Sequence, residues 1–230
     1  MGAERLTFPI MLGGLVAAGA GIGALIALMS RGLPNNKPVQ LPEPPPSQTA
    51  QANQSPYAQF QLADFILTDR DGQPADASIF DGKVTFLSFF FASCPGPCPI
   101  ISAKMIELQR ATEGSPVQLV SISVDGLRDT PQVISDYADG YSADPDRWHF
   151  LTGDPALVEA LLAESLGFTL GRRPDEPVQA VDGSTISNII HPTRIMLVGP
   201  DRRLLAAPVS ATDADGVTEM MSEALRAAGS

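Results

Sequence analysis

Two cysteines, separated by three residues, lie in the stretch FFFASCPGPCP over residues 89–99, and the sequence contains no others. Thiolates are nucleophiles and soft metal ligands, so Cys94 and Cys98 are suited to thiol-disulfide exchange or to metal binding. Two inert buried thiols, or one structural bridge, are the alternatives. A bridge across so short a loop would contribute little entropic stabilisation. The pair is therefore a candidate chemical site.

A metal site needs further donors, and the sequence contains two histidines. His149 lies in DRWHFLTG beside an apolar segment, and we interpret it as a packed or surface residue. His191 lies in SNIIHPTRIMLVGPD, directly before a predicted β-hairpin. Two thiolates and one imidazole suit Cu(I) and can accept Cu(II), whereas a closed zinc site needs another donor. A lone histidine beside a strand is usually structural, so both interpretations of His191 stay open on spacing alone.

Strand and helix patterns alternate from residue 60 onward. Buried strands are predicted over 83–92 and 117–124, a hairpin over 193–207, and helices after Cys98, Thr130 and Asp154 and over 215–229. This order predicts a three-layer α/β fold of thioredoxin type. Cys98 then occupies the first turn of a helix, whose aligned peptide dipoles stabilise thiolate over thiol. In such a fold, His191 lies over the same helix terminus.

The N-terminus predicts a membrane anchor. Residues 8–29 form a run of 22 residues without a charged side chain. Such a run is long enough to cross a hydrocarbon core of about 30 Å, and it exceeds the usual apolar region of a cleaved signal peptide, which is the alternative. Residues 31–58 are rich in proline and poor in large apolar side chains, so they predict an extended linker. The expected organisation is an N-terminal transmembrane helix within residues 1–30, a linker over 31–58 and the α/β domain over 59–230.

The charge balance limits the classes of partner. Fifteen basic and 26 acidic side chains give a formal net charge of −11. This excess opposes non-specific attraction to phosphate backbones and to anionic lipid headgroups. We expect no nucleic-acid partner.

Several separate blocks together resemble the Sco/SenC family of copper-binding assembly factors for cytochrome c oxidase. These blocks are FFFASCPGPCPIISAKM, SISVDGLRDTP, WHFLTG and the spacing from His191 to VGPD. The resemblance implies a thioredoxin-like domain, copper ligands at Cys94, Cys98 and His191, and a metallochaperone rather than an enzyme. It also implies a single-pass protein of the inner (cytoplasmic) membrane with its soluble domain on the outer, periplasmic-type side. The implied partner is the copper-centre subunit of the oxidase, which receives copper by ligand exchange from a shallow, exposed site.

Departures from the family pattern keep a second function open. Gly126 stands where the family often has proline, and Pro97 stiffens the segment between the cysteines. His191-Pro192-Thr193 resembles the X-Pro-Thr of thioredoxins, whose cis proline faces the redox pair. The alternative is a thiol-disulfide oxidoreductase that uses Cys94 and Cys98 as redox-active thiols to keep partner cysteines reduced. Peroxide reduction is less well supported, because no Pro-x-x-x-Thr-x-x-Cys arrangement precedes the cysteines.

Overall fold

The computed structural model describes residue 57 and residues 59–229. The elements are β1 (Ile66–Asp69), β2 (Pro74–Asp76), η2 (Ala77–Phe80), β3 (Thr85–Phe90), α1 (Cys98–Ala111), β4 (Gln118–Ser123), α2 (Pro131–Gly140), β5 (Trp148–Thr152), α3 (Pro155–Ala160), η3 (Leu161–Ser165), β6 (Gly171–Gln179), β7 (Thr185–Ile190), β8 (Arg194–Val198), β9 (Val209–Ser210) and α4 (Ala214–Ala227). The predicted anchor lies outside these residues, as does the predicted linker apart from residue 57. Across the described part of the chain, no helix is both long and apolar enough to cross a bilayer.

A seven-stranded sheet, in the order β2-β1-β5-β4-β3-β8-β9, forms the centre of the described domain. The middle strands β3, β4 and β5 are parallel, and β1 and β8 flank them in antiparallel orientation. Every residue of β3 and of β4 is buried. Continuous burial is expected for parallel strands that are covered on both faces, which explains the long apolar runs in the sequence.

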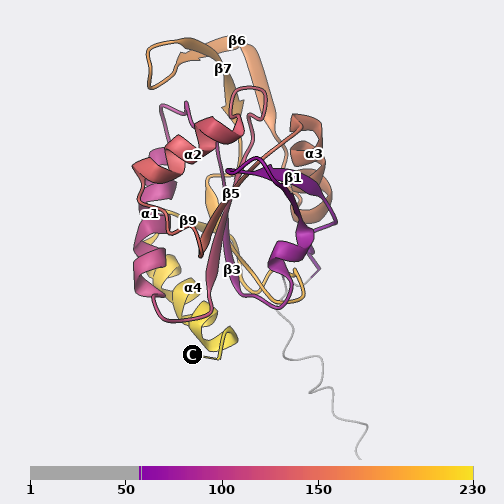
Figure 1. Ribbon diagram of the computed structural model, residues 1–230, viewed down its shortest axis with the longest axis vertical. Helices are drawn as coiled ribbons and strands as arrows, with labels where there is room; N and C mark the ends of the chain where they lie inside the picture. The colour runs from indigo at the N-terminus through magenta and orange to yellow at the C-terminus, as the bar shows by residue number, and fades with distance from the viewer. Residues whose placement is uncertain (1–56, 58, 230) are drawn as a thin grey trace, which may run out of the picture. The chain divides into compact units, whose positions relative to one another are not determined.

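Helices cover the sheet on both sides. Figure 1 shows α1, α2 and α4 on one side and α3 on the other. A 2.8 Å hydrogen bond between the hydroxyls of Ser102 on α1 and Tyr137 on α2 joins two of these helices, and the Phe90 ring of the sheet stacks on Tyr137. The predicted three-layer α/β order is confirmed.

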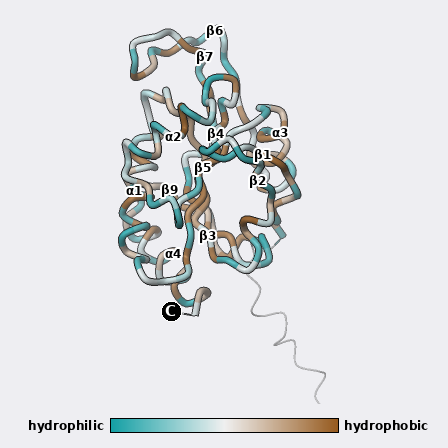
Figure 2. Tube along the Cα trace, in the orientation of Figure 1, coloured by the Kyte–Doolittle hydropathy of each residue, from teal (hydrophilic) through white to brown (hydrophobic). Residues whose placement is uncertain are grey.

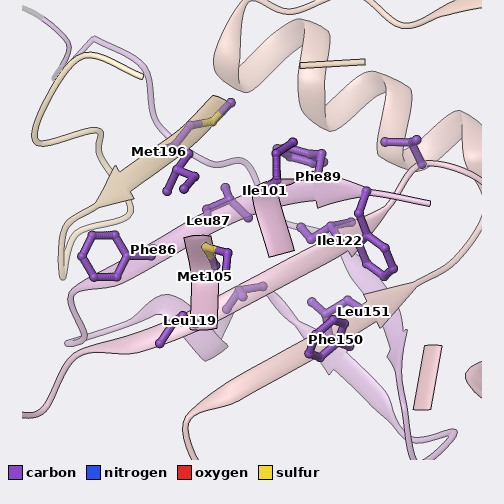
Figure 3. Packing of buried hydrophobic residues seen from close by; sticks show 14 of the residues in the cluster. Phe86, Leu87, Phe89, Ile101, Met105, Leu119, Ile122, Phe150, Leu151 and Met196 are labelled. Carbon is purple, nitrogen blue, oxygen red and sulfur yellow. The ribbon is translucent and has the colours of Figure 1, made fainter. Parts of the chain in front are cut away.

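The buried apolar side chains form one continuous core. Ile101, Met105 and Leu108, the predicted buried face of α1, are at most 2% exposed. They pack toward the apolar strands, which Figure 2 shows as the hydrophobic centre of the domain and Figure 3 shows from close by. The indole N–H of Trp148 donates to the Ser121 hydroxyl at 3.0 Å, so this buried donor is satisfied.

Helices α2 and α3 begin where their capping residues and prolines predict. The hydroxyl of Thr130 accepts from the backbone N–H of Val133, and the carboxylate of Asp154 accepts from Ala156 N–H. In both helices the next residue is proline, which needs no intrahelical partner at the first position. α1 begins at Cys98 itself, as predicted.

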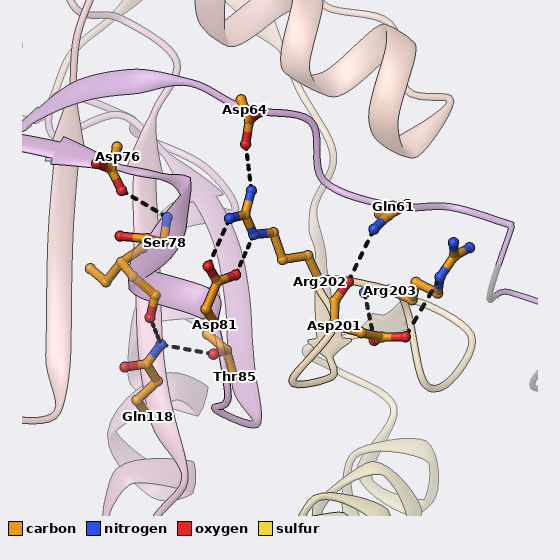
Figure 4. A network of polar contacts seen from close by, with 11 residues as sticks. Gln61, Asp64, Asp76, Ser78, Asp81, Thr85, Gln118, Asp201, Arg202 and Arg203 are labelled. Atoms are coloured by element: carbon orange, nitrogen blue, oxygen red, sulfur yellow. Dashed lines mark hydrogen bonds and ion pairs between the residues drawn. The ribbon is translucent and has the colours of Figure 1, made fainter.

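The predicted hairpin over 193–207 is only partly correct. β8 forms, but its expected second strand is reduced to a single bridge between Val198 and Leu204, and β9 pairs with β8 instead. The residues after the turn are hydrogen-bonded instead to the N-terminal segment of the domain: Leu204 N–H donates to the Phe60 carbonyl at 3.0 Å. Arg202 fixes this arrangement, because it adopts a φ of 65° and its guanidinium binds both Asp64 and Asp81 (Figure 4).

A second hairpin, β6–β7, was not predicted. It forms a separate two-stranded sheet and projects beyond the main sheet in Figure 1. Six consecutive residues of β6 are exposed, so the strand lacks the alternating pattern that sequence reasoning uses. The guanidinium of Arg172 donates to the Val124 carbonyl at 3.0 Å and ties the start of this hairpin to the end of β4.

Candidate metal centre

Three donor side chains meet at the edge of the sheet where β3 ends. β3 leads through residues 91–97 into α1, so Cys94 lies in the loop and Cys98 opens the helix. His191 follows β7 and directly precedes the short connection to β8, which pairs with β3. The two sulfur atoms and the imidazole nitrogen all lie within 4.8 Å of one another. The structure therefore brings together the three residues that the sequence singled out.

The hydrogen bonds of His191 identify which ring nitrogen is free. Nδ1 lies 3.0 Å from the carbonyl oxygen of Pro192, and Nε2 lies 3.3 Å from Sγ of Cys98. A carbonyl oxygen only accepts, so Nδ1 carries the proton and donates it. In the neutral ring Nε2 then presents its lone pair to the sulfur atoms, which is the orientation that a metal ligand requires.

The two thiols are chemically unequal, and neither is in a disulfide. The hydrogen bond from the Cys98 thiol is the main cause that lowers the pKa of Cys94 to about 4, and the backbone N–H groups of Cys98 and Gly96 lower it further, against the opposing effect of burial. The pKa of Cys98 is raised, because its hydrogen bond to Cys94 and its burial both hold its proton. The pair therefore keeps one shared proton, with Cys94 as the thiolate.

The site is buried, which corrects the expectation of a shallow, exposed one. Cys94 is 3% exposed, Cys98 is 0% and His191 is 7%. Loop 91–97 and hairpin β6–β7 enclose the site, because residues of both line a cavity of about 300 Å³ beside it. Cys94 and His191 border this cavity and Cys98 does not. An incoming ligand therefore reaches the centre from the side of Cys94 and His191.

The walls of this cavity were not foreseen from the sequence. Val178, Ile189 and Ile190 of the hairpin and Pro95 and Pro97 of the loop contribute apolar lining. The sequence did contain one signal for the hairpin, the Asp-Gly pair at 182–183 between β-branched residues. Gly183 adopts a φ of 80° there, a conformation that favours glycine.

His149 lies apart from this cluster, as interpreted from the sequence. It is half-buried on β5, where its backbone pairs with that of Val120. Burial, followed by the charges of Lys83 and Arg70, lowers the pKa of His149. The metal-ligating group found among the described residues does not include it.

The donor set suits a thiophilic metal ion of low coordination number. Two sulfur ligands and one imidazole complete a three-coordinate site, and within the described residues no fourth His, Cys, Asp or Glu joins the group. A closed structural zinc site has four protein ligands, so zinc fits this set less well. The same two sulfurs, close and unequal in pKa, are also suited to thiol-disulfide exchange.

Fold and site define a mixed α/β, thioredoxin-like domain with a Cys-x-x-x-Cys and histidine centre. The family model described as SCO1/SenC matches residues 53–226. The chain therefore belongs to the SCO1/SenC family.

Comparisons with individual proteins agree with this assignment. The SCO1 protein homolog of Bacillus subtilis is 28% identical over 149 residues, which cover 64% of this chain and 72% of that protein. The structure of Bradyrhizobium japonicum ScoI with copper bound is 27% identical, with a TM-score of 0.56 over 72% of this chain and 98% of that one. BsSco, described as a member of the Sco family of cytochrome c oxidase assembly proteins with a disulfide switch, is 25% identical, with a TM-score of 0.58 over 74% and 96%.

Proposed function

We propose that this protein is a membrane-anchored copper chaperone that supports assembly of the dinuclear copper centre of cytochrome c oxidase. The observation that carries the proposal is the convergence of Cys94, Cys98 and His191, with all donor atoms within 4.8 Å. The similarity of this chain to ScoI, whose structure has copper bound, supports copper as the metal that it carries. Thiolate and imidazole donors suit both Cu(I) and Cu(II).

Each ligand has a distinct part in holding and releasing copper. Cys94 is the thiolate of the free protein and borders the cavity, so an acceptor sulfur or nitrogen can replace it first. His191 also borders the cavity and is the next ligand within reach. Cys98 is fully buried at the start of α1 and holds the ion until the acceptor has supplied the other ligands.

Exposed apolar side chains near the site support a protein as the acceptor. Leu127 is 80% exposed in the loop that follows β4, and Val181 is 66% exposed at the turn of hairpin β6–β7. Ile190, 46% exposed, directly precedes His191. Apolar side chains exposed around a functional site favour contact with another protein surface. The similarity to BsSco, a member of a family of cytochrome c oxidase assembly proteins, supports a subunit of this oxidase as the partner. Because the proposed cargo is copper, we assign this role to the subunit that carries the copper centre.

The membrane arrangement completes the proposal. The uncharged run within residues 1–30 serves as a single transmembrane anchor in the inner (cytoplasmic) membrane, and residues 31–58 act as a tether. The domain over 59–230 then lies on the outer, periplasmic-type side. In this arrangement the tether lets the domain reach an oxidase subunit in the same membrane.

The copper-delivery proposal is tested in cells from which the gene has been deleted. We expect cytochrome c oxidase activity to fall and to recover in part when copper is added to the medium. Re-expression of the parent chain should restore activity, whereas a Cys94→Ser, Cys98→Ser double variant should not. Full oxidase activity in the deletion strain at limiting copper would contradict the proposal. If expression of the full-length chain yields a soluble protein that begins near residue 30, the N-terminal run is cleaved and the proposed anchor is contradicted.

A second candidate function is thiol-disulfide exchange, which the lowered pKa of Cys94 favours. The Cys94 thiolate would attack a partner disulfide, forming a mixed disulfide and releasing one partner thiolate. Cys98, once deprotonated, would then attack the Cys94 sulfur and release the second partner thiolate, so that two electrons pass to the partner. Rapid exchange with glutathione disulfide by a chain that binds copper weakly would favour this function over copper delivery.

A further inference from the structure

The carboxylate of Asp129 connects two loops behind the metal centre. The parallel strands β3 and β4 pair with Phe90 beside Ser123, so the loops that follow these strands leave the same edge of the sheet. Asp129 lies in the second loop. Its Oδ2 atom accepts from the backbone N–H of Ala92 at 3.0 Å and from the Ser123 hydroxyl at 2.5 Å. The side chain therefore spans from the end of β4 to the loop that carries Cys94.

Asp129 is itself held firmly in place. It is 1% exposed, its N–H donates to the Asp125 carbonyl at 2.9 Å, and its own carbonyl accepts from the Thr152 hydroxyl at 2.6 Å. Hydrogen bonds to a buried carboxylate are stronger than those between neutral groups, and leaving such donors unpaired is costly. The carboxylate is thus a fixed point to which the Cys94 loop is attached.

The loop over residues 91–97 has few other attachments. Pro95 and Pro97 have no N–H to donate. Apart from the start of α1, the described residues give its backbone two hydrogen bonds to other elements: Ala92 N–H to Asp129 at 3.0 Å, and Val181 N–H to the Ser93 carbonyl at 3.4 Å. The bond to Asp129 is the shorter, and it lies two residues from Cys94.

We infer that Asp129 is a positioning residue for the metal centre, holding Cys94 opposite Cys98 and His191 through the N–H of Ala92. The inference rests on the proposed copper site for its functional meaning. Without this acceptor the Cys94 side of the site loosens, so copper leaves faster and the two thiols no longer keep their fixed separation. Partners that orient metal ligands commonly change affinity by about 10- to 100-fold when they are removed.

The test compares three variants of the full chain. Asp129→Ala removes the acceptor, whereas Asp129→Asn keeps an oxygen in the same place. Thr152→Val is the matched control, because it removes a hydrogen bond to the Asp129 carbonyl and leaves the side-chain bond to Ala92 intact. The measurements are hydrogen exchange of the Ala92 amide without copper, the rate of copper release to a chelator, and the thiolate-to-Cu(II) absorption.

In Asp129→Ala we expect Ala92 exchange and copper release to rise about tenfold or more, with an altered absorption spectrum. Asp129→Asn and Thr152→Val should remain close to the parent. The inference would be overturned if Asp129→Ala kept the parental rates of Ala92 exchange and copper release, or if Asp129→Asn raised these rates as much as Asp129→Ala. If Asp129→Ala does not fold, Asp129→Ser decides, because its hydroxyl keeps a polar group there but ends one bond short of the carboxylate oxygen that accepts from Ala92 N–H: faster Ala92 exchange supports the inference and unchanged exchange overturns it. Since this exchange is measured without copper, a parent chain that binds no copper would overturn the proposed function alone.

Discussion

Nε2 of His191 lies 3.3 Å from Sγ of Cys98, although 93 positions separate the two residues in the sequence. The pairing of β8 with β3 brings them together, since His191 precedes β8 and β3 leads toward the cysteines. The metal centre is thus a product of sheet topology rather than of a local motif. Changes to either the cysteine loop or the β7–β8 connection should therefore affect the same site.

The first prediction concerns the thiolate. In Cys98→Ala the pKa of Cys94 should rise from about 4 toward that of an ordinary thiol, because its main stabilising hydrogen bond is lost. The pH dependence of Cys94 alkylation measures this shift. Reaction at Cys94 should require a pH at least one unit higher in the variant. An unchanged profile would show that Cys98 does not stabilise the thiolate.

The second prediction concerns the stability of the fold near Asp129. Burial raises the pKa of Asp129 to about 6, against hydrogen bonds from Ser123 and Ala92; Asp125 raises it further and Arg128 lowers it. Between about pH 4 and pH 6 the folded protein keeps a proton that the unfolded chain has lost, so stability falls as pH rises. A pKa shift of this size changes the free energy of unfolding by up to about 3 kcal/mol across this pH range.

In Asp129→Asn this contribution is absent. Denaturant unfolding at pH 4 and pH 7 should therefore show a smaller loss of stability between the two pH values in the variant than in the parent. Equal losses would mean that Asp129 has an ordinary pKa. Other groups that titrate in this range cancel, because both proteins contain them.

The third prediction concerns the ion pairs in Figure 4. Arg202 binds Asp64 and Asp81 together and joins the turn after β8 to the entrance of the domain. Arg202→Ala should lower the Tm clearly more than Arg173→Ala, which removes one exposed pair with Glu176. Isolated exposed pairs contribute about 0–1 kcal/mol, so the Arg173 variant should remain near the parent. If the two variants lower the Tm equally in thermal unfolding, the paired contacts of Arg202 do not stabilise the fold as expected.

The fourth prediction separates docking from metal binding. Leu127→Ser and Val181→Ser should slow copper transfer to the soluble copper-centre fragment of the oxidase by several-fold, with no change in copper affinity. Leu157→Ser is the matched control, since Leu157 is also exposed, at 50%, but lies on α3 on the other side of the sheet. Transfer kinetics by stopped-flow absorption measure the difference. If the control slows transfer as much, the apolar side chains near the site are not the docking surface.

Much of the fold could be predicted because its signals are local. The apolar run of β3 and the capping residues Thr130 and Asp154 each determine an element through nearby chemistry. The prediction of a second hairpin strand after β8 is wrong because the contacts that decide this region are not local. Residues around Arg202 find partners in the segment that enters the domain, and no local pattern records that contact.

The site shows the same division. Cys94 and Cys98 could be selected from spacing, and His191 from its place before a strand together with the family resemblance. Burial of the centre could not be predicted, because hairpin β6–β7 encloses it with a strand of mostly exposed residues. The bond from Asp129 to Ala92 was also hidden, since it depends on the register of β3 against β4.

The central claim is tested most directly by a copper competition titration of the full chain in its reduced and disulfide forms, with His191→Ala and His149→Ala variants. The reduced parent should bind one copper, and the disulfide form far less, because oxidation removes both thiolates. His191→Ala should lose about tenfold or more in affinity, whereas His149→Ala, half-buried on β5 outside the cluster, should match the parent. Parental affinity in His191→Ala, or equal binding by the reduced and disulfide forms, would contradict a copper centre at Cys94, Cys98 and His191.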